Sequence, residues 1–155
     1  MEFLATIEMS PVTAALRNSV WAYPLVNTAH ILGIAMLFGA ILPLDLRLLG
    51  FFGRVPLGQL TDVLRPVAVN GFRIALGAGV LLFATDARDY AVSNIFRAKM
   101  IVIVLALSNA LVLGRVARWD EARQARGALL MRIAGGTSIA LWLTVITLGR
   151  FIGYF

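Results

Sequence analysis

The stretch NSVWAYPLVNTAHILGIAMLFGAILPL, residues 18–44, decides the fold, because it contains no Asp, Glu, Lys or Arg. A charged side chain is costly at the centre of a bilayer, whereas a helix of about 20 apolar residues spans the hydrocarbon core. Trp21 and Tyr23 suit the headgroup zone, and Pro24 suits a first helical turn. We therefore predict a first membrane-spanning helix over residues 20–44.

The composition of the whole chain agrees with that interpretation. Of its 155 residues, 60% are hydrophobic and 14% are charged, and the mean hydropathy is +0.87. Soluble domains have about 45–50% apolar and about 25% charged residues. The sequence contains no cysteine, which excludes disulfide scaffolds, iron–sulfur clusters and thiolate metal sites. The composition thus indicates an integral membrane protein.

Three further uncharged or nearly uncharged stretches predict spans at approximately 66–85, 97–115 and 131–151, with Arg73 inside the second. We expect an all-α, antiparallel four-helix bundle forming a single transmembrane domain over 1–155, with short interfacial helices at 2–16 and 57–65. Small residues at spacing four let membrane helices approach closely. They occur in every predicted span: Ala29–Gly33, Ala35–Gly39, Gly71–Ala75, Ala106–Ala110–Gly114 and Gly136–Ala140.

The distribution of positive charge predicts the orientation. The net charge of +6 comes from thirteen arginines and one lysine, and in so apolar a chain it indicates anionic lipid rather than nucleic acid. The predicted inner loops hold eight of these residues and the outer segments five, so both termini should face outward. The arginine-rich segment 115–132 either touches anionic lipid or docks a partner. Gly149 and Gly153 offer a surface where a second copy could bind.

His30 is the only histidine and lies about ten residues into the first span. A polar ring at that depth needs a partner, and three interpretations stay open: a hydrogen bond to a neighbouring helix, ligation of haem b or copper, and proton transfer. Asn27 lies one turn earlier on the same face. Because the chain has a single histidine, a second axial haem ligand would be a methionine, such as Met36 or Met100, or would come from another subunit.

Other polar residues also lie within or beside the predicted spans. Asp45 is expected to pair with Arg73 or Arg65, although an anion or substrate site at Arg73 and nearby Asn70 is the alternative. Lys99 either anchors the third span at the interface or binds a carboxylate or a haem propionate. The remaining candidates are Asn109 in the third span and the hydroxyl residues of the fourth: Thr137, Ser138, Thr144 and Thr147.

The order of these residues resembles a family of small bacterial four-helix inner-membrane proteins, a domain of unknown function. The likeness is carried by Trp21-Ala-Tyr23-Pro24, His30-Ile-Leu-Gly33 and Asp45-Leu-Arg47-Leu-Leu-Gly50, with Asn94-Ile-Phe96-Arg-Ala-Lys99 as a later landmark. A histidine in the first helix and a lysine opening the third are also distantly similar to the copper-resistance protein D type and the four-helix protoporphyrinogen oxidase type. These resemblances imply a bacterial inner membrane and copper or haem chemistry. Many members of the first family have an acidic residue at Asn27 and a histidine near Gly114, which this chain lacks.

Three functions follow from these observations. The chain is a membrane protein that binds haem b or copper through His30, a structural or accessory subunit of a larger membrane complex, or a small proton-coupled transporter. The sequence shows no nucleophile–base pair and no phosphate-binding loop, so it does not favour an enzyme with catalytic side chains of its own.

Overall fold

The computed structural model describes the backbone of residues 2–119 and 124–154 and the side chains of 2–113 and 128–154. Every regular element in this part of the chain is an α-helix, and the predicted all-α class with four long helices is confirmed. The elements are α1 (Glu2–Glu8), α2 (Pro11–Asn18), α3 (Ala22–Leu49), α4 (Leu57–Thr85), α5 (Ala87–Val92), α6 (Asn94–Trp119) and α7 (Gln124–Phe151).

Four of these helices are long and apolar enough to cross a membrane, as a multi-pass membrane protein requires. The segments with that property are Ala22–Leu49, Leu57–Thr85, Asn94–Leu113 and Ala128–Phe151. Large apolar side chains are exposed along them, among them Leu25, Ile31 and Val104. Exposed apolar side chains of this kind suit a hydrocarbon environment, in which lipid tails replace water around the helices.

The helices differ from the prediction at the ends of the first two spans. Helix α3 continues to Leu49, so Asp45 lies inside it, and α4 begins at Leu57 rather than near Pro66. Residues 57–65 are therefore the first turns of α4 and not a separate surface helix. Pro66 lies inside α4, and proline is tolerated within membrane helices because neighbouring groups satisfy the backbone carbonyl that it leaves without a donor.

The chain divides into two compact units. Unit 1 comprises Met1–Gly39 and Pro66–Asn94, and unit 2 comprises Ala40–Arg65 and Ile95–Phe155. Helices α3 and α4 each contribute one part to each unit.

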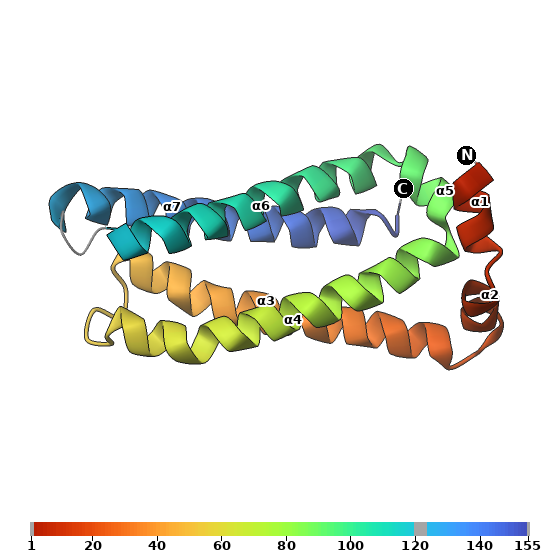
Figure 1. Cartoon of the computed structure of the whole chain (residues 1–155), viewed down its shortest axis with the longest axis horizontal. Coiled ribbons are helices and arrows are strands. Elements are labelled where there is room, and N and C mark those ends of the chain that lie inside the picture. The colour runs from red at the N-terminus through yellow and green to blue at the C-terminus, as the bar shows by residue number, and fades with distance from the viewer. Residues whose placement is uncertain (1, 120–123, 155) are drawn as a thin grey trace. The chain divides into compact units, whose positions relative to one another are not determined.

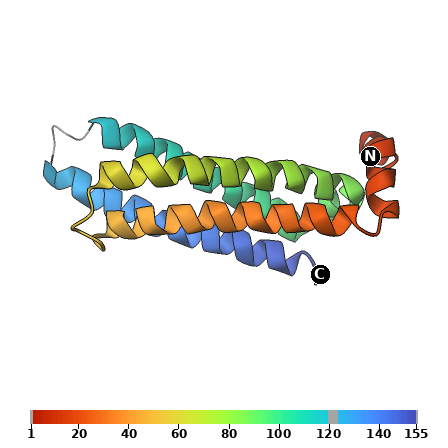
Figure 2. The same ribbon diagram turned by 90° about the horizontal axis from the view of Figure 1, so that it is seen from below.

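In unit 1, α3 and α4 run side by side in opposite directions (Figures 1 and 2). Glycines let the two backbones touch: a Cβ on Gly33 would lie 2.5 Å from the backbone nitrogen of Ala75, and one on Gly71 would lie 2.5 Å from that of Leu37. Two of the predicted rows of small residues thus meet each other. The row ending at Gly39 does not take part in such a contact, because a Cβ at Gly39 would meet nothing within 4 Å.

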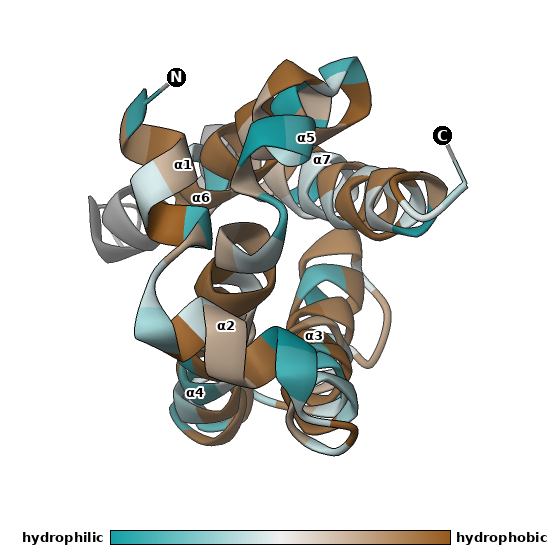
Figure 3. Ribbon diagram, turned by 90° about the vertical axis from the view of Figure 1, so that its right-hand side faces the viewer, coloured by the Kyte–Doolittle hydropathy of each residue, from teal (hydrophilic) through white to brown (hydrophobic). Residues whose placement is uncertain are grey.

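The predicted N-terminal segment 2–16 forms two short helices, α1 and α2, which Ser10 separates. The Ser10 hydroxyl caps α2 by accepting from the backbone N–H of Thr13. Figure 3, which looks onto this end, shows hydrophilic residues on α5 and at both ends of α1. Polar residues at the end of a span are expected where the chain leaves hydrocarbon.

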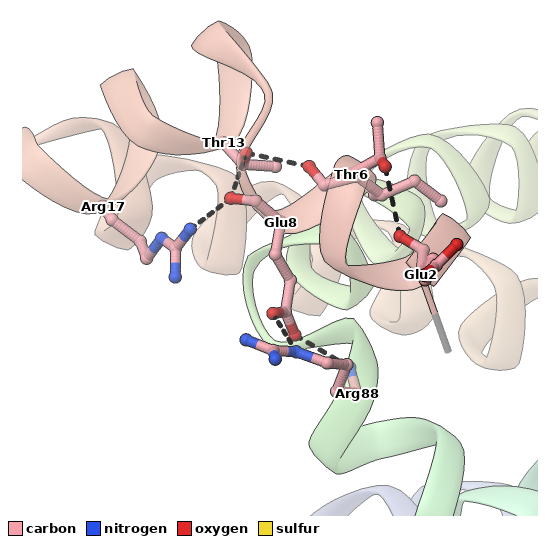
Figure 4. A network of polar contacts seen from close by, with 7 residues as sticks. Glu2, Thr6, Glu8, Thr13, Arg17 and Arg88 are labelled. Atoms are coloured by element: carbon pink, nitrogen blue, oxygen red, sulfur yellow. Dashed lines mark hydrogen bonds and ion pairs between the residues drawn. The ribbon is translucent and has the colours of Figure 1, made fainter.

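Glu8 links α1 to α5 through hydrogen bonds to its buried carboxylate (Figure 4). The backbone N–H of Arg88 donates to Oε1 across 2.8 Å, and Nε of Arg88 donates to Oε2 across 2.6 Å. The guanidinium of Arg17 donates to the backbone carbonyl of Glu8, which also accepts from the Thr13 hydroxyl. The pKa of Glu8 lies below its ordinary value of 4.5, chiefly because the Arg88 backbone donates to the charged form.

In unit 2, one face of α7 is buried at regular spacing, and it consists of Gly135, Ser138, Trp142 and Val145. Gly135 brings α7 against α3, since a Cβ there would lie 3.0 Å from the backbone oxygen of Asp45. This spacing of three and four residues is that of a helical face turned toward its neighbours. Gly136, which the sequence suggested as a packing position, is less crowded. A Cβ added there would make only an ordinary contact, 3.7 Å from Cδ2 of Leu49.

Candidate functional site

The best-defined polar contact between two long helices is made by His30. This residue projects from α3 toward α4, where ring nitrogen Nδ1 lies 2.7 Å from the backbone oxygen of Ala75. A carbonyl oxygen only accepts hydrogen bonds, so Nδ1 carries the proton in this contact. The predicted hydrogen bond to a neighbouring helix is therefore present.

Gly79 makes room for this ring. A Cβ at Gly79 would lie 3.0 Å from Cε1 of His30 and 3.3 Å from Nδ1, which is closer than side chains normally pack. Gly79 follows Gly71 and Ala75 at spacing four on α4. The face of α4 that packs against α3 therefore also leaves room for the imidazole ring. The sequence analysis identified Gly71 and Ala75 as a packing signal but did not include Gly79.

The structure does not bring Met36 to His30. A Cβ on Gly71 would lie 2.9 Å from Cβ of Met36, whereas His30 faces Gly79, eight residues further along α4. The two side chains also start six residues apart on α3, about 9 Å along the axis at 1.5 Å per residue. Asn27 is exposed on α3. A ligand role for Met36 or Asn27 beside His30 stays a prediction.

Arg73 and Asn70 form a local contact on the exposed side of α4, where Nη1 of Arg73 donates to Oδ1 of Asn70 across 3.4 Å. Both residues are exposed, in contrast to buried Gly71 and Ala75 on the face that meets α3. Anion or substrate binding by Arg73 stays a prediction.

Asp45 is buried in unit 2, where its side chain accepts a hydrogen bond from the hydroxyl of Ser138. Its second oxygen, Oδ2, is buried without a partner. Arg65 is exposed, and its pairing with Asp45 stays a prediction. A pairing of Asp45 with Arg73 stays a prediction, since the two residues belong to different units.

Lys99 lies on α6 with its ammonium against α7. A Cβ on Gly149 would lie 3.2 Å from Nζ and 3.5 Å from Cε of this lysine. Gly149 thus gives room to Lys99 within unit 2, whereas the sequence suggested a surface for a second copy there. Binding of a carboxylate or haem propionate by Lys99 stays a prediction.

Asn109 links the two long helices of unit 2, because its Nδ2 donates to the backbone oxygen of Ala134 across 3.0 Å. It lies on an otherwise apolar groove with Thr137, lined also by Val112, Leu113, Leu130, Ile133 and Ala134. Thr144 and Thr147 donate to carbonyls of their own helix. Their hydroxyls therefore give no evidence of a cavity.

The described residues contain no group of three or more His, Asp or Glu that could hold a metal ion. The arginine-rich segment 115–132 lies largely outside the described side chains. No family model matches the chain, and no curated protein or solved structure matches it either.

Proposed function

We propose that this chain is a multi-pass membrane protein that binds haem b through Nε2 of His30. The observation that supports it is the hydrogen bond from Nδ1 to the Ala75 carbonyl. Histidines that ligate a metal almost always donate from the other ring nitrogen to a carbonyl or carboxylate, which orients the ring and raises the basicity of the ligand.

The donor set favours haem over copper. A copper site needs several protein ligands, and the described residues hold no group of three His, Cys, Asp or Glu that could bind a metal ion. Haem brings four nitrogen ligands of its own, so one imidazole is enough to attach it. A second ligand to the iron would be supplied by a methionine or by a residue of another subunit.

The protein's own residues would have two tasks in such a site. Ala75 would hold the ring of His30 at a set angle, and Gly79 would keep side-chain bulk away from its Cε1 edge. When bound, haem supplies one-electron chemistry. The family resemblance adds the proposal of a bacterial inner membrane, and the arginine count adds outward termini and anionic lipid at the inner loops.

The test is the absorption spectrum and iron content of protein purified in mild detergent. We expect a Soret band and iron in the wild type and in Asn27→Ala, whose exposed side chain lies one turn from His30 on the same helix. His30→Asn should lose both and stay folded, because its amide can donate to Ala75 as Nδ1–H does but does not ligate iron. Circular dichroism and gel filtration check that fold.

Two results would contradict haem binding. One is a colourless wild type that takes up no added haem, and the other is a His30→Asn variant that keeps the Soret band. Copper in place of iron in the purified protein would also overturn haem and favour the copper interpretation.

A further inference from the structure

The strongest unexplained feature outside the His30 site is a pair of buried polar atoms in unit 2. Oδ2 of Asp45 and Nε1 of Trp142 both lack a hydrogen-bond partner. The exposed fractions are only 3% for Asp45 and 5% for Trp142. Buried polar groups without partners are rare because each costs free energy, so two of them on neighbouring elements call for a physical explanation.

These atoms belong to one local arrangement. Ser138 and Trp142 lie one turn apart on the buried face of α7, and the Ser138 hydroxyl donates to the Asp45 carboxyl. Long side chains on a helix point back toward its N-terminus, which for Trp142 is the direction of Ser138. Gly135 holds the backbone of Asp45 against the same face, at the close distance given above.

Among the described side chains of unit 2, none of the cationic groups is a hydrogen-bond partner of Oδ2 of Asp45. On α3, Arg47 donates to the backbone oxygens of Val55 and Gly53. On α7, the guanidinium of Arg132 lies 3.8 Å from the Cβ position of Gly50. On α6, Lys99 lies at Gly149, which is eleven residues from Ser138 along α7, or about 16 Å. Asp62 and Arg65 of α4 are exposed.

We propose that Asp45, Ser138 and Trp142 form a proton-binding site in which Oδ2 of Asp45 takes up and releases a proton. An isolated carboxylate in a low-dielectric interior tends to be neutralised by protonation. A metal cation would need several oxygen ligands, whereas a proton needs the one oxygen that lies without a partner. This inference concerns unit 2 and is independent of haem binding at His30.

The two hydrogen-bond donors, Ser138 and Trp142, both suit the ionised carboxylate, which only accepts hydrogen bonds. With the proton bound, Oδ2–H is a donor and the other oxygen accepts from Ser138. When the proton leaves to water, the negative charge stays on the carboxylate and Ser138 continues to donate. The indole N–H of Trp142, which only donates, then supplies a second hydrogen bond to the carboxylate, directly or through a water molecule.

Infrared spectroscopy of the full-length protein in lipid vesicles tests this site directly. We expect a protonated-carboxyl band that disappears reversibly as pH rises, with the release of one proton per chain. Asp45→Asn should lose the band and the proton. Asp62→Asn, which removes the same charge from an exposed position of unit 2, should keep both.

Conservative changes at the two donors separate proton binding from a purely structural role. Ser138→Ala and Trp142→Phe each remove a hydrogen bond to the charged form and should move the midpoint of the transition to higher pH by about one unit. Trp21→Phe, at an exposed tryptophan, should leave the midpoint in place. The proposal is overturned if Asp45 stays ionised, or stays protonated, over the whole pH range in which the protein is folded. Unshifted midpoints in both donor variants would also overturn it.

Discussion

His30 and Ala75 join two long helices through one hydrogen bond, in which Nδ1 of the ring donates to the carbonyl oxygen across 2.7 Å. Along α3, His30 lies two turns from Leu37, which the backbone of Gly71 approaches closely. The hydrogen bond and the close backbone contact are therefore neighbours at the interface between α3 and α4. The ring therefore has a structural role whether or not a cofactor is bound.

Replacing His30 by Leu should destabilise the protein by about 0.6 kcal/mol and by no more than about 1.7 kcal/mol, the average and the maximum measured for side-chain hydrogen bonds between membrane helices. His30→Asn should lose less, because its amide keeps a donor near the position of Nδ1. Unfolding in denaturing detergent, measured without added haem, compares the two variants. Equal stabilities would show that the bond to Ala75 contributes nothing.

Gly33→Ala should destabilise the α3–α4 seam by roughly 1–3 kcal/mol, as overpacking does in well-packed cores. The added Cβ would lie 2.5 Å from the nitrogen of Ala75 and 2.8 Å from the oxygen of Gly71, so the backbones must move apart. Gly39→Ala is the matched control, since its Cβ would meet nothing within 4 Å. If both variants unfold alike, the close approach is wrong.

The contact between Glu8 and Arg88 should depend on pH. The folded-state pKa of Glu8 is lowered from 4.5, so its stabilising effect is fully present above about pH 4.5 and is lost as pH falls through the lower folded value. Hydrogen exchange at the Arg88 amide, measured across this interval, should therefore accelerate on acidification.

Glu8→Gln should remove that pH dependence and expose α1 to protease already at neutral pH. Glu2→Gln, at the exposed start of the same helix, should behave as the wild type. Equal protection of the Arg88 amide in Glu8→Gln and the wild type would speak against the contact.

Asn109→Leu should weaken the association of α6 with α7 by about 1 kcal/mol, because the carbonyl of Ala134 loses its donor. Thr144→Val should have almost no effect, since Thr144 bonds only to its own helix. Detergent unfolding of the two variants makes the comparison. A larger loss in Thr144→Val than in Asn109→Leu would reverse the assignment of the interhelical bond.

The sequence predicted the four long helices well because charge marks their ends. It was less reliable where a charged residue continues a helix: Asp45 lies inside α3, and the turns before Pro66 belong to α4. When a predicted span is ended at its first charged residue, the predicted helix is too short wherever the observed helix extends into the headgroup zone. Charged side chains are tolerated in that zone.

The candidate residues were identified more successfully than their partners. His30, Asp45 and Asn109 all make polar contacts between helices. Asp45 was assigned an arginine because charge complementarity is visible in sequence, whereas its hydrogen bond from Ser138 depends on the packing of α7 at Gly135. The sequence does contain the spacing of a buried helical face, formed by Gly135, Ser138, Trp142 and Val145. Spacing alone, however, does not determine which neighbouring helix this face contacts.

The amino-acid sequence by itself determined that this chain has four long apolar helices and few ionisable groups between them. The physical reason is that an ionic charge is unfavourable in hydrocarbon whatever surrounds it. Only the tertiary structure decided that His30 meets Ala75 and that Asp45 meets Ser138. Those pairings depend on the register between helices, and the register is set where Gly33, Gly71 and Gly135 let two backbones touch.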